Sequence, residues 1–360
     1  MEHCATMDVA ALQERARAVL DSTAYDYFVG GADDEVTLRD NDAAWQRIRL
    51  LPKVLRDVSA VDPRTTVLGE HIAAPILVAP TAYHRLAHDE GEAATARGVA
   101  AAGTVMCVST LATVSLEDVA AAAPGGPRWF QLYIRRDRSI TEDLVRRAAA
   151  AGYTALVVTV DLPVFGRRWK DERNNFTLPE GLIMANFDAP TPSVDGSGLA
   201  AYAAAEFDRS LTFDDLTWLR DVSGLPIVVK GVLRADDAAS AVAAGAAAVI
   251  VSNHGARQLD TAVATADALP AVAEAVAGRA EVYVDGGIRR GTDVVKALAM
   301  GARAVLVGRP ILWGLACGGA QGVEEVVAEL IDEFVRALML CGAADPHDVT
   351  PDLLARSPWA

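Results

Sequence analysis

The chain has 360 residues, 52% of them hydrophobic, and a formal net charge of −15. This composition predicts a globular protein and argues against nucleic acid or an anionic membrane as a partner, because both require a basic face. No apolar stretch is long enough to span a bilayer, and the first residues are amphipathic rather than a signal peptide. The four cysteines form no C-x-x-C pair, so neither zinc nor a disulfide framework is indicated. We therefore expect a cytoplasmic protein without a metal site.

Two helical patterns open the chain, and a regular alternation follows them. We expect one helix from Asp8 to Phe28, ended by Gly30-Gly31, and a charged helix from Asp33 to Arg47. Short apolar segments then alternate with stretches of helix length. The predicted strands are Ile76–Ala79, Thr104–Val108, Trp129–Leu132, Ala155–Thr159, Pro226–Lys230, Ala248–Ser252, Glu281–Asp285 and Ala304–Gly308. The predicted helices between them include Glu90–Ala102, Ser115–Ala123, Ile140–Ala151, Ala235–Ala244 and Asp293–Met300.

Eight strands that alternate with helices predict an α/β protein with a (β/α)8 TIM barrel. A doubly wound sheet is the competing interpretation, but the strand count and the lack of G-x-G-x-x-G after an early strand favour the barrel. We expect one domain over 1–360, with an N-terminal helical segment at 1–70, the barrel at 71–315 and C-terminal helices at 316–360.

One connection is longer than the rest, because residues 162–225 separate the fourth strand from the fifth. The segment contains Pro179, Pro190, Pro192 and a Gly/Ser stretch at Ser193–Gly198. We expect a helix near Asp214–Arg220 and a lid over the barrel mouth, and a passive insertion remains the alternative.

Polar residues follow every predicted strand, at the end where barrel enzymes carry their active sites. The residues at or just after the strand ends are Pro80, Thr81, Ala82, Ser109, Gln131, Tyr133, Thr159, Asp161, Lys230, Ser252, His254, Arg257, Asp285, Gly286, Gly287, Arg289, Gly308 and Arg309, and each end includes at least one polar side chain. The turns "VDGGIRRGTD" and "LVGRP" each combine glycines with an arginine, a pattern typical of a phosphate site.

Several motifs, in order, resemble one family. They are "YDYFVGGADDEVTLRDN", "PILVAPTA", "FQLYIRRDR", "TVDLPVFGRR", "IVVKGV", "SNHGARQLD" and "DGGIRRGTDVVKALAMGARAVLVGRP". Together they resemble the FMN-dependent 2-hydroxy acid oxidases and dehydrogenases, which include glycolate oxidase, lactate oxidase and mandelate dehydrogenase. Within that family the chain is most similar to the mandelate and 4-hydroxymandelate oxidases.

The resemblance implies roles for the matching residues. FMN would contact Pro80, Thr81, Ala82, Ser109, Gln131, Thr159 and Ser252, with Lys230 beside the flavin ring and Asp285, Gly286, Gly287, Arg289, Gly308 and Arg309 at the phosphate. The substrate carboxylate would be bound by Arg168, Arg257 and Tyr27. His254 would be the base, Asp161 its partner and Tyr133 a donor to the substrate hydroxyl.

Three residues bear on substrate and acceptor. Ala82 resembles the oxidases of the family, which implies O2 as acceptor and H2O2 as product. Leu111, where glycolate oxidases carry a bulky aromatic, and Phe165 imply room for an aryl group. The expected reaction is oxidation of (S)-mandelate or 4-hydroxymandelate to the 2-oxo acid; an oxidase or dehydrogenase of lactate or glycolate is the alternative.

The resemblance also implies a homo-oligomer, as a tetramer, and leaves open whether hydride or carbanion chemistry operates. A non-redox FMN enzyme acting on a diphosphate is a rival hypothesis, which the His–Arg pair of "SNHGAR" disfavours.

Overall fold

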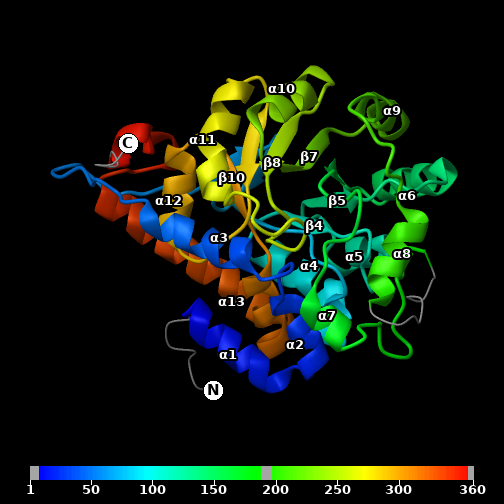
Figure 1. The fold of residues 1–360 in the computed structure, drawn as a ribbon. Coiled ribbons are helices and arrows are strands. Elements are labelled where there is room, and N and C mark those ends of the chain that lie inside the picture. Colours follow the sequence, from blue (N-terminus) through cyan, green and yellow to red (C-terminus); the bar gives the residue numbers. More distant parts are fainter. Residues whose placement is uncertain (1–7, 188–196, 356–360) are drawn as a thin grey trace.

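Eight parallel strands close into a barrel in the computed structural model, which describes residues 8–187 and 197–355 (Figure 1). Around the ring the order is β10-β3-β4-β5-β6-β7-β8-β9. The strands are β3 (Ile76–Val78), β4 (Met106–Val108), β5 (Arg128–Leu132), β6 (Ala155–Thr159), β7 (Ile227–Val232), β8 (Ala248–Val251), β9 (Glu281–Val284) and β10 (Ala304–Val307). The prediction of a (β/α)8 barrel is thereby confirmed. β7 runs past its predicted end at Lys230, because Gly231, with φ 109°, forms an irregularity that lets pairing resume at Val232.

The strands are buried on both faces, as expected for a parallel sheet covered by helices. Residues of one parity fill the barrel interior, among them Trp129, Val157 and Tyr283. Residues of the other parity, such as Phe130 and Val158, join a larger core formed with the helices.

Each barrel strand is followed by a helix that packs around the barrel, and β6 is followed by additional helices from the insertion. The helices that pack around the barrel are α4 (Gly91–Ala101), α5 (Leu116–Ala122), α6 (Arg138–Ala150), α9 (Asp214–Ser223), α10 (Ala235–Ala243), α11 (Thr265–Val276), α12 (Gly291–Ala299) and α13 (Arg309–Cys341). Short 3-10 helices occur at His84–Leu86, Pro346–Asp348 and Pro351–Leu353. The predicted boundary at 315/316 falls inside α13, which begins directly after β10 and is interrupted by non-helical backbone at Gly318 and Gly319.

A hairpin that was not predicted lies at the amino-terminal end of the barrel. β1 (Thr65–Val67) and β2 (Glu70–Ile72) pair antiparallel. Val67 and Ile72 pack in the barrel interior cluster, and the Leu68 N–H donates to Glu281 Oε1 on β9 at 3.1 Å. The hairpin therefore covers the end of the barrel opposite to the polar strand ends.

The N-terminal prediction is wrong in one respect, because the single helix expected from Asp8 to Phe28 is two helices. α1 (Val9–Val19) and α2 (Ser22–Val29) are separated at Asp21, whose carboxylate accepts from the Thr23 and Ala24 N–H groups. That cap begins a new helix, and helical periodicity across the junction conceals it. α3 (Val36–Arg47) begins later than the predicted Asp33, because Asp33 and Glu35 have positive φ.

The 162–225 insertion contributes two further helices, α7 (Trp169–Arg173) and α8 (Gly198–Glu206), ahead of α9. The predicted helix near Asp214–Arg220 is α9. Pro190, Pro192 and Ser193–Gly196, all cited for the predicted loop, lie outside the described residues. Arg135 anchors α8 through Tyr202 and Glu206, which both contact its guanidinium. Among the described residues, no helix is long and apolar enough to cross a membrane.

Candidate active site

A cavity opens at the carboxyl ends of the barrel strands, and the empty space in it and in its open mouth is about 1020 Å³. Eighteen of the twenty predicted site residues line it: Tyr27, Pro80, Thr81, Ala82, Ser109, Gln131, Tyr133, Thr159, Arg168, Lys230, His254, Arg257, Asp285, Gly286, Gly287, Arg289, Gly308 and Arg309. The other two, Asp161 and Ser252, lie directly behind it, where they hydrogen-bond to lining residues.

Strand periodicity explains this convergence. Along β5, the inward parity passes from Trp129 to Gln131 and continues to Tyr133 just after the strand; after β9, Asp285 continues the parity of Tyr283. Inward positions are thus apolar low in the barrel and polar at its upper rim.

His254 lies in a tight turn after β8 and is held from two sides. It has φ 60°, and its N–H donates to Ser252 Oγ at 3.1 Å. Its Nδ1 is 2.8 Å from Asp161 Oδ1, and its Nε2 is 3.4 Å from the Tyr133 hydroxyl. Gly231 makes room for Asp161, since a Cβ there would lie 2.6 Å from the Asp161 side chain.

Burial sets the protonation of this pair. It holds the pKa of His254 below its usual 6.5, although Asp161 acts in the opposite direction. Burial would raise the pKa of Asp161, but His254, Lys230 and a backbone hydrogen bond together outweigh it, and the Asp161 pKa lies below its ordinary value. The imidazole is therefore neutral beside an ionised carboxylate, so its Nδ1–H donates to Asp161 and its Nε2 lone pair is free to accept a proton from the cavity.

Two arginines from different loops approach each other across the cavity. Arg168, just before α7, is 4% exposed, lies 4.0 Å over the Phe165 ring and donates to the Arg257 carbonyl. Burial, and then the charge of Arg257, lowers the pKa of Arg168 to about 10, so it is still protonated at neutral pH. Arg257 lies 4.9 Å from the Tyr27 ring centroid, and Tyr27 stacks on Phe176.

Lys230 is a buried cation on β7. It donates to Ser252 Oγ at 2.8 Å and forms an ion pair with Asp285 Oδ2 at 3.2 Å. Burial would lower the Lys230 pKa, but Asp285 and Asp161 outweigh it and the pKa is raised. The ammonium is therefore charged in an otherwise buried setting.

The turn after β9 lines the cavity with two glycines, whose backbone is not covered by side chains. Gly286 and Gly287 have φ of 89° and 80°, and a Cβ on Gly287 would lie 2.2 Å from the Asn41 carbonyl. The turn is therefore closely packed against α3, and Trp45 donates its indole N–H to Gly286. Arg289 and Arg309 line the cavity beside it; burial, and then Arg257, lowers the pKa of Arg309 to about 9.

These groups fit FMN, which the sequence resemblance implies. The glycine turn and the two arginines suit a phosphate. Asp285 Oδ1 is buried without a hydrogen-bond partner, as expected of an acceptor for a ligand hydroxyl. Gln131, which bonds Ser109 and Thr159, and Lys230 offer polar groups to a ring edge.

Sequence reasoning missed some of the apolar lining. Leu199 on α8 and Leu312 on α13 line the cavity, together with the anticipated Leu111 and Phe165. No local signal could place Leu199 there, because it reaches the cavity through the fold of the long insertion. The insertion thus supplies Phe165, Arg168 and Leu199 to the site.

Comparisons with known proteins agree with this geometry. Residues 16–356 match the family model described as FMN-dependent dehydrogenase. The chain is 51% identical to an L-lactate oxidase of Nostoc sp. over 95% of this chain and 96% of that protein. It is 49% identical to human 2-hydroxyacid oxidase 1, over 97% of this chain and 96% of that protein. A crystal structure of mandelate oxidase with (S)-4-hydroxymandelic acid superposes with a TM-score of 0.92 at 44% identity, covering 97% of this chain and 98% of that one.

A family match across most of the chain, together with relatives of this identity, settles the class of the protein. The resemblance seen in the sequence is confirmed, and so are FMN as cofactor and the reaction class. The chain belongs to the FMN-dependent dehydrogenase family and is an oxidoreductase that acts on the CH–OH group of 2-hydroxy acids.

Proposed function

We propose that this protein oxidises (S)-mandelate or 4-hydroxymandelate to the corresponding 2-oxo acid and passes the electrons to O2, forming H2O2. The proposal rests on four features that share one cavity: an unprotonated imidazole nitrogen, two guanidinium groups and an apolar wall of Leu111, Phe165 and Leu199.

Arg257 and Arg168 bind the substrate carboxylate in this proposal. Both line the cavity and both are charged, and a guanidinium fork matches a carboxylate in two hydrogen bonds. Tyr27, whose pKa is raised by burial, stays protonated and can donate a third bond. Fixing the carboxylate leaves the α-carbon with one orientation toward the cofactor and the base.

His254 is the base. FMN, when bound, supplies the two-electron acceptor for the substrate C–H bond. Nε2 accepts a proton from the substrate, and the resulting imidazolium is stabilised by Asp161 at 2.8 Å. Hydride and carbanion routes both require this unprotonated nitrogen. Tyr133, within 3.4 Å of Nε2, donates to the substrate hydroxyl.

Lys230 supplies positive charge where the cofactor becomes more negative. Its ammonium is buried and kept protonated by Asp285, so it needs no reorganisation when charge arrives. Arg289 and Arg309 hold the phosphate, and Gly286 and Gly287 let the backbone approach it.

The apolar wall favours an aryl substrate. Leu111, Phe165 and Leu199 lie on the same cavity as His254 and the two arginines. The structural neighbour holds an aryl hydroxy acid, whereas the lactate and glycolate oxidases, at 51% and 50% identity, favour a smaller acid as the second candidate. The choice of O2 is supported by Ala82 and by the oxidase relatives.

The test is anaerobic mixing of the purified yellow protein with (S)-mandelate, (S)-4-hydroxymandelate, lactate and glycolate. We expect the aryl acids to bleach the flavin absorbance fastest, and air to restore it with one H2O2 per flavin. Faster bleaching by lactate or glycolate would favour the second candidate, and no reoxidation by air would exclude O2 as the acceptor.

The predicted homo-oligomer and cytoplasmic location stay proposals as well. Sedimentation at several protein concentrations would test the tetramer implied by the family resemblance. Fractionation of the source cells would test the location.

A further inference from the structure

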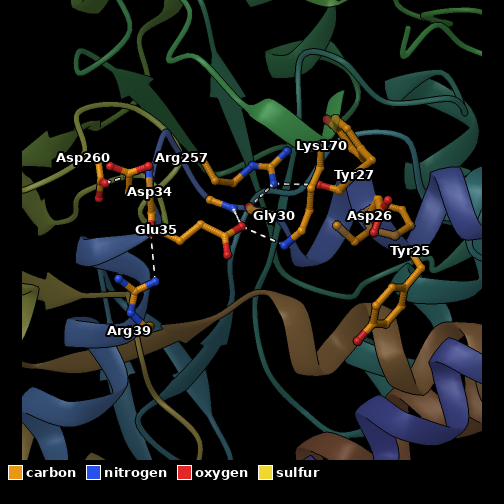
Figure 2. Close-up of polar contacts among 12 residues, drawn as sticks. Tyr25, Asp26, Tyr27, Gly30, Asp34, Glu35, Arg39, Lys170, Arg257 and Asp260 are labelled. Atoms are coloured by element: carbon orange, nitrogen blue, oxygen red, sulfur yellow. Dashed lines mark hydrogen bonds and ion pairs between the residues drawn. The ribbon is translucent and has the colours of Figure 1, made fainter. Parts of the chain in front are cut away.

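A single peptide group, the one joining Gly30 to Gly31, lies between a carboxylate and two guanidinium groups. Figure 2 shows the Glu35 carboxylate and the Arg257 guanidinium on either side of Gly30. Its N–H donates to Glu35 Oε1 at 3.0 Å. Its C=O accepts from Arg257 Nη1 at 2.7 Å and from Arg309 Nη2 at 3.0 Å. The peptide therefore connects a negative group on one side with two positive groups on the other.

Glu35 is held in place by its own partners. It lies at the start of α3 with φ 59°, and the same Oε1 accepts from Lys170 Nζ at 2.8 Å. Both side chains are 27% exposed, so the ion pair is partly shielded from water. Burial would raise the pKa of Glu35, but the bonds from Gly31 and Lys170 outweigh it and the pKa is lowered, so Glu35 is ionised at neutral pH.

The two arginines on the other side repel each other. Arg257 is among the causes, after burial, that lower the pKa of Arg309. A shared carbonyl oxygen offsets this repulsion, and a carboxylate on the N–H of the same peptide polarises that oxygen into a stronger acceptor. The ionic group at Glu35 thus acts on both guanidiniums through one peptide.

The surrounding packing leaves this peptide little freedom. A Cβ on Gly30 would lie 2.9 Å from the Asp26 carbonyl, and a Cβ on Gly31 would lie 3.1 Å from the Ala256 carbonyl. The Ala32 and Asp33 N–H groups donate to the carbonyls of Ala256 and Arg167, next to Arg257 and Arg168. The loop is therefore fixed to both loops that carry the substrate arginines.

We propose that Glu35, held by Lys170, is a positioning residue that orients Arg257 and Arg309 through the Gly30–Gly31 peptide, and so couples the binding of the substrate carboxylate to that of the FMN phosphate. The inference rests on the proposed function, because it takes the phosphate role of Arg309 and the carboxylate role of Arg257 from it.

The test compares FMN with riboflavin, which lacks the phosphate, for binding to the full-length apoprotein by quenching of flavin fluorescence. Glu35→Gln is the main variant. Lys170→Met is the second, and it keeps the alkyl stem near Gly30. The matched control is Glu172→Gln, which removes the Arg167–Glu172 ion pair at α7. The side chains of this pair are more exposed than those of Glu35 and Lys170.

We expect Glu35→Gln to weaken FMN binding about tenfold and Lys170→Met to weaken it about threefold. Riboflavin binding should be unchanged in both variants, because each changes a charged hydrogen bond that acts on Arg309 only through the Gly30–Gly31 peptide. With the holoenzyme, both variants should raise KM for the hydroxy acid several-fold while kcat changes less than about twofold. Glu172→Gln should match the wild type in every measurement.

Arg309→Met separates failure of this inference from failure of the proposed function. If Arg309→Met weakens FMN but not riboflavin while the Glu35 and Lys170 variants leave FMN binding unchanged, the coupling is refuted and the phosphate role stands. Equal loss of both flavins in the Glu35 and Lys170 variants would show a merely structural role and also refute the coupling. Equal loss of both flavins in Arg309→Met would overturn the phosphate role and the inference together.

Discussion

The two ends of the barrel interior have the same geometry and opposite chemistry. At the lower end, inward positions carry Trp129, Ala155 and Tyr283, and the β1–β2 hairpin closes over them. At the upper rim the same parity carries Gln131 and Asp285, which face an open cavity. The difference shows that strand periodicity sets where a side chain points, whereas residue type decides whether that position stabilises the fold or serves chemistry.

Removing the base at the rim should have the largest effect on catalysis. His254→Ala should retain the flavin spectrum but slow flavin reduction by (S)-mandelate about 10⁴-fold, since a positioned general base contributes up to that factor. Stopped-flow absorbance under anaerobic conditions measures it. His71→Ala, on the exposed face of the lower hairpin, is the control and should reduce at the wild-type rate. Near-normal reduction in His254→Ala would refute its role.

A substitution at the lower end of the barrel should change the free energy of unfolding and leave kcat nearly unchanged. Trp129 is fully buried in the interior cluster, so Trp129→Ala should lower the free energy of unfolding by about 3–5 kcal/mol. The kcat of the folded fraction should stay within about twofold. Urea unfolding followed by circular dichroism, with kcat at low temperature, checks both. A large loss of kcat with unchanged stability would contradict the division between the two ends.

Arg257→Lys tests the carboxylate clamp. A point charge cannot replace the guanidinium fork, so we expect affinity for the hydroxy acid to fall about 100-fold, corresponding to about 2.7 kcal/mol. The reduction rate at saturating substrate should fall much less. Dependence of the anaerobic reduction rate on substrate concentration separates the two quantities. Wild-type affinity would exclude Arg257 from carboxylate binding.

Leu111→Trp tests whether the apolar wall binds the aryl group of the substrate. An indole at this cavity-lining position fills the space proposed for the aryl ring, so the ratio of kcat/KM for mandelate over glycolate should fall about tenfold or more. Steady-state rates with both acids give the ratio. An unchanged ratio would place the aryl group elsewhere.

A change of pH near neutrality should alter the catalytic rate only slightly. Because burial holds the pKa of His254 below 6.5, the base is already unprotonated at pH 7. The kcat/KM should therefore change less than about twofold between pH 7 and 8 and fall only as pH drops through the lowered pKa. A pH–rate profile with its acid limb centred above pH 7 would contradict the neutral imidazole.

Much of this arrangement was predictable because it depends on local pattern. Residues at strand ends, such as Thr159 and Asp285, could be placed from the alternation of apolar segments and turns. The break at Asp21 was missed, because a helix cap and an interior aspartate look alike within one helical period. The β1–β2 hairpin was missed because its strands, TTV and EHI, each contain a single apolar residue and so form no apolar segment.

Other features depend on tertiary contacts that no local pattern encodes. Leu199 reaches the cavity through a helix of the insertion that Arg135 anchors. The Gly30–Gly31 peptide, which the sequence pattern identifies only as a helix stop, contacts Arg257 and Arg309, more than 200 residues later in the chain. Such contacts follow from the packing of segments outside the barrel on its rim and not from sequence spacing.

Base, carboxylate clamp and cofactor should all meet at the upper rim of the barrel. A crystal structure of the FMN-bound protein with benzoylformate, the 2-oxo acid made from mandelate, tests it most directly. We predict the carboxylate within hydrogen-bond distance of both Arg168 and Arg257, with the α-carbon between His254 Nε2 and the flavin. A carboxylate that contacts neither guanidinium, or a flavin bound away from Lys230, would contradict the account.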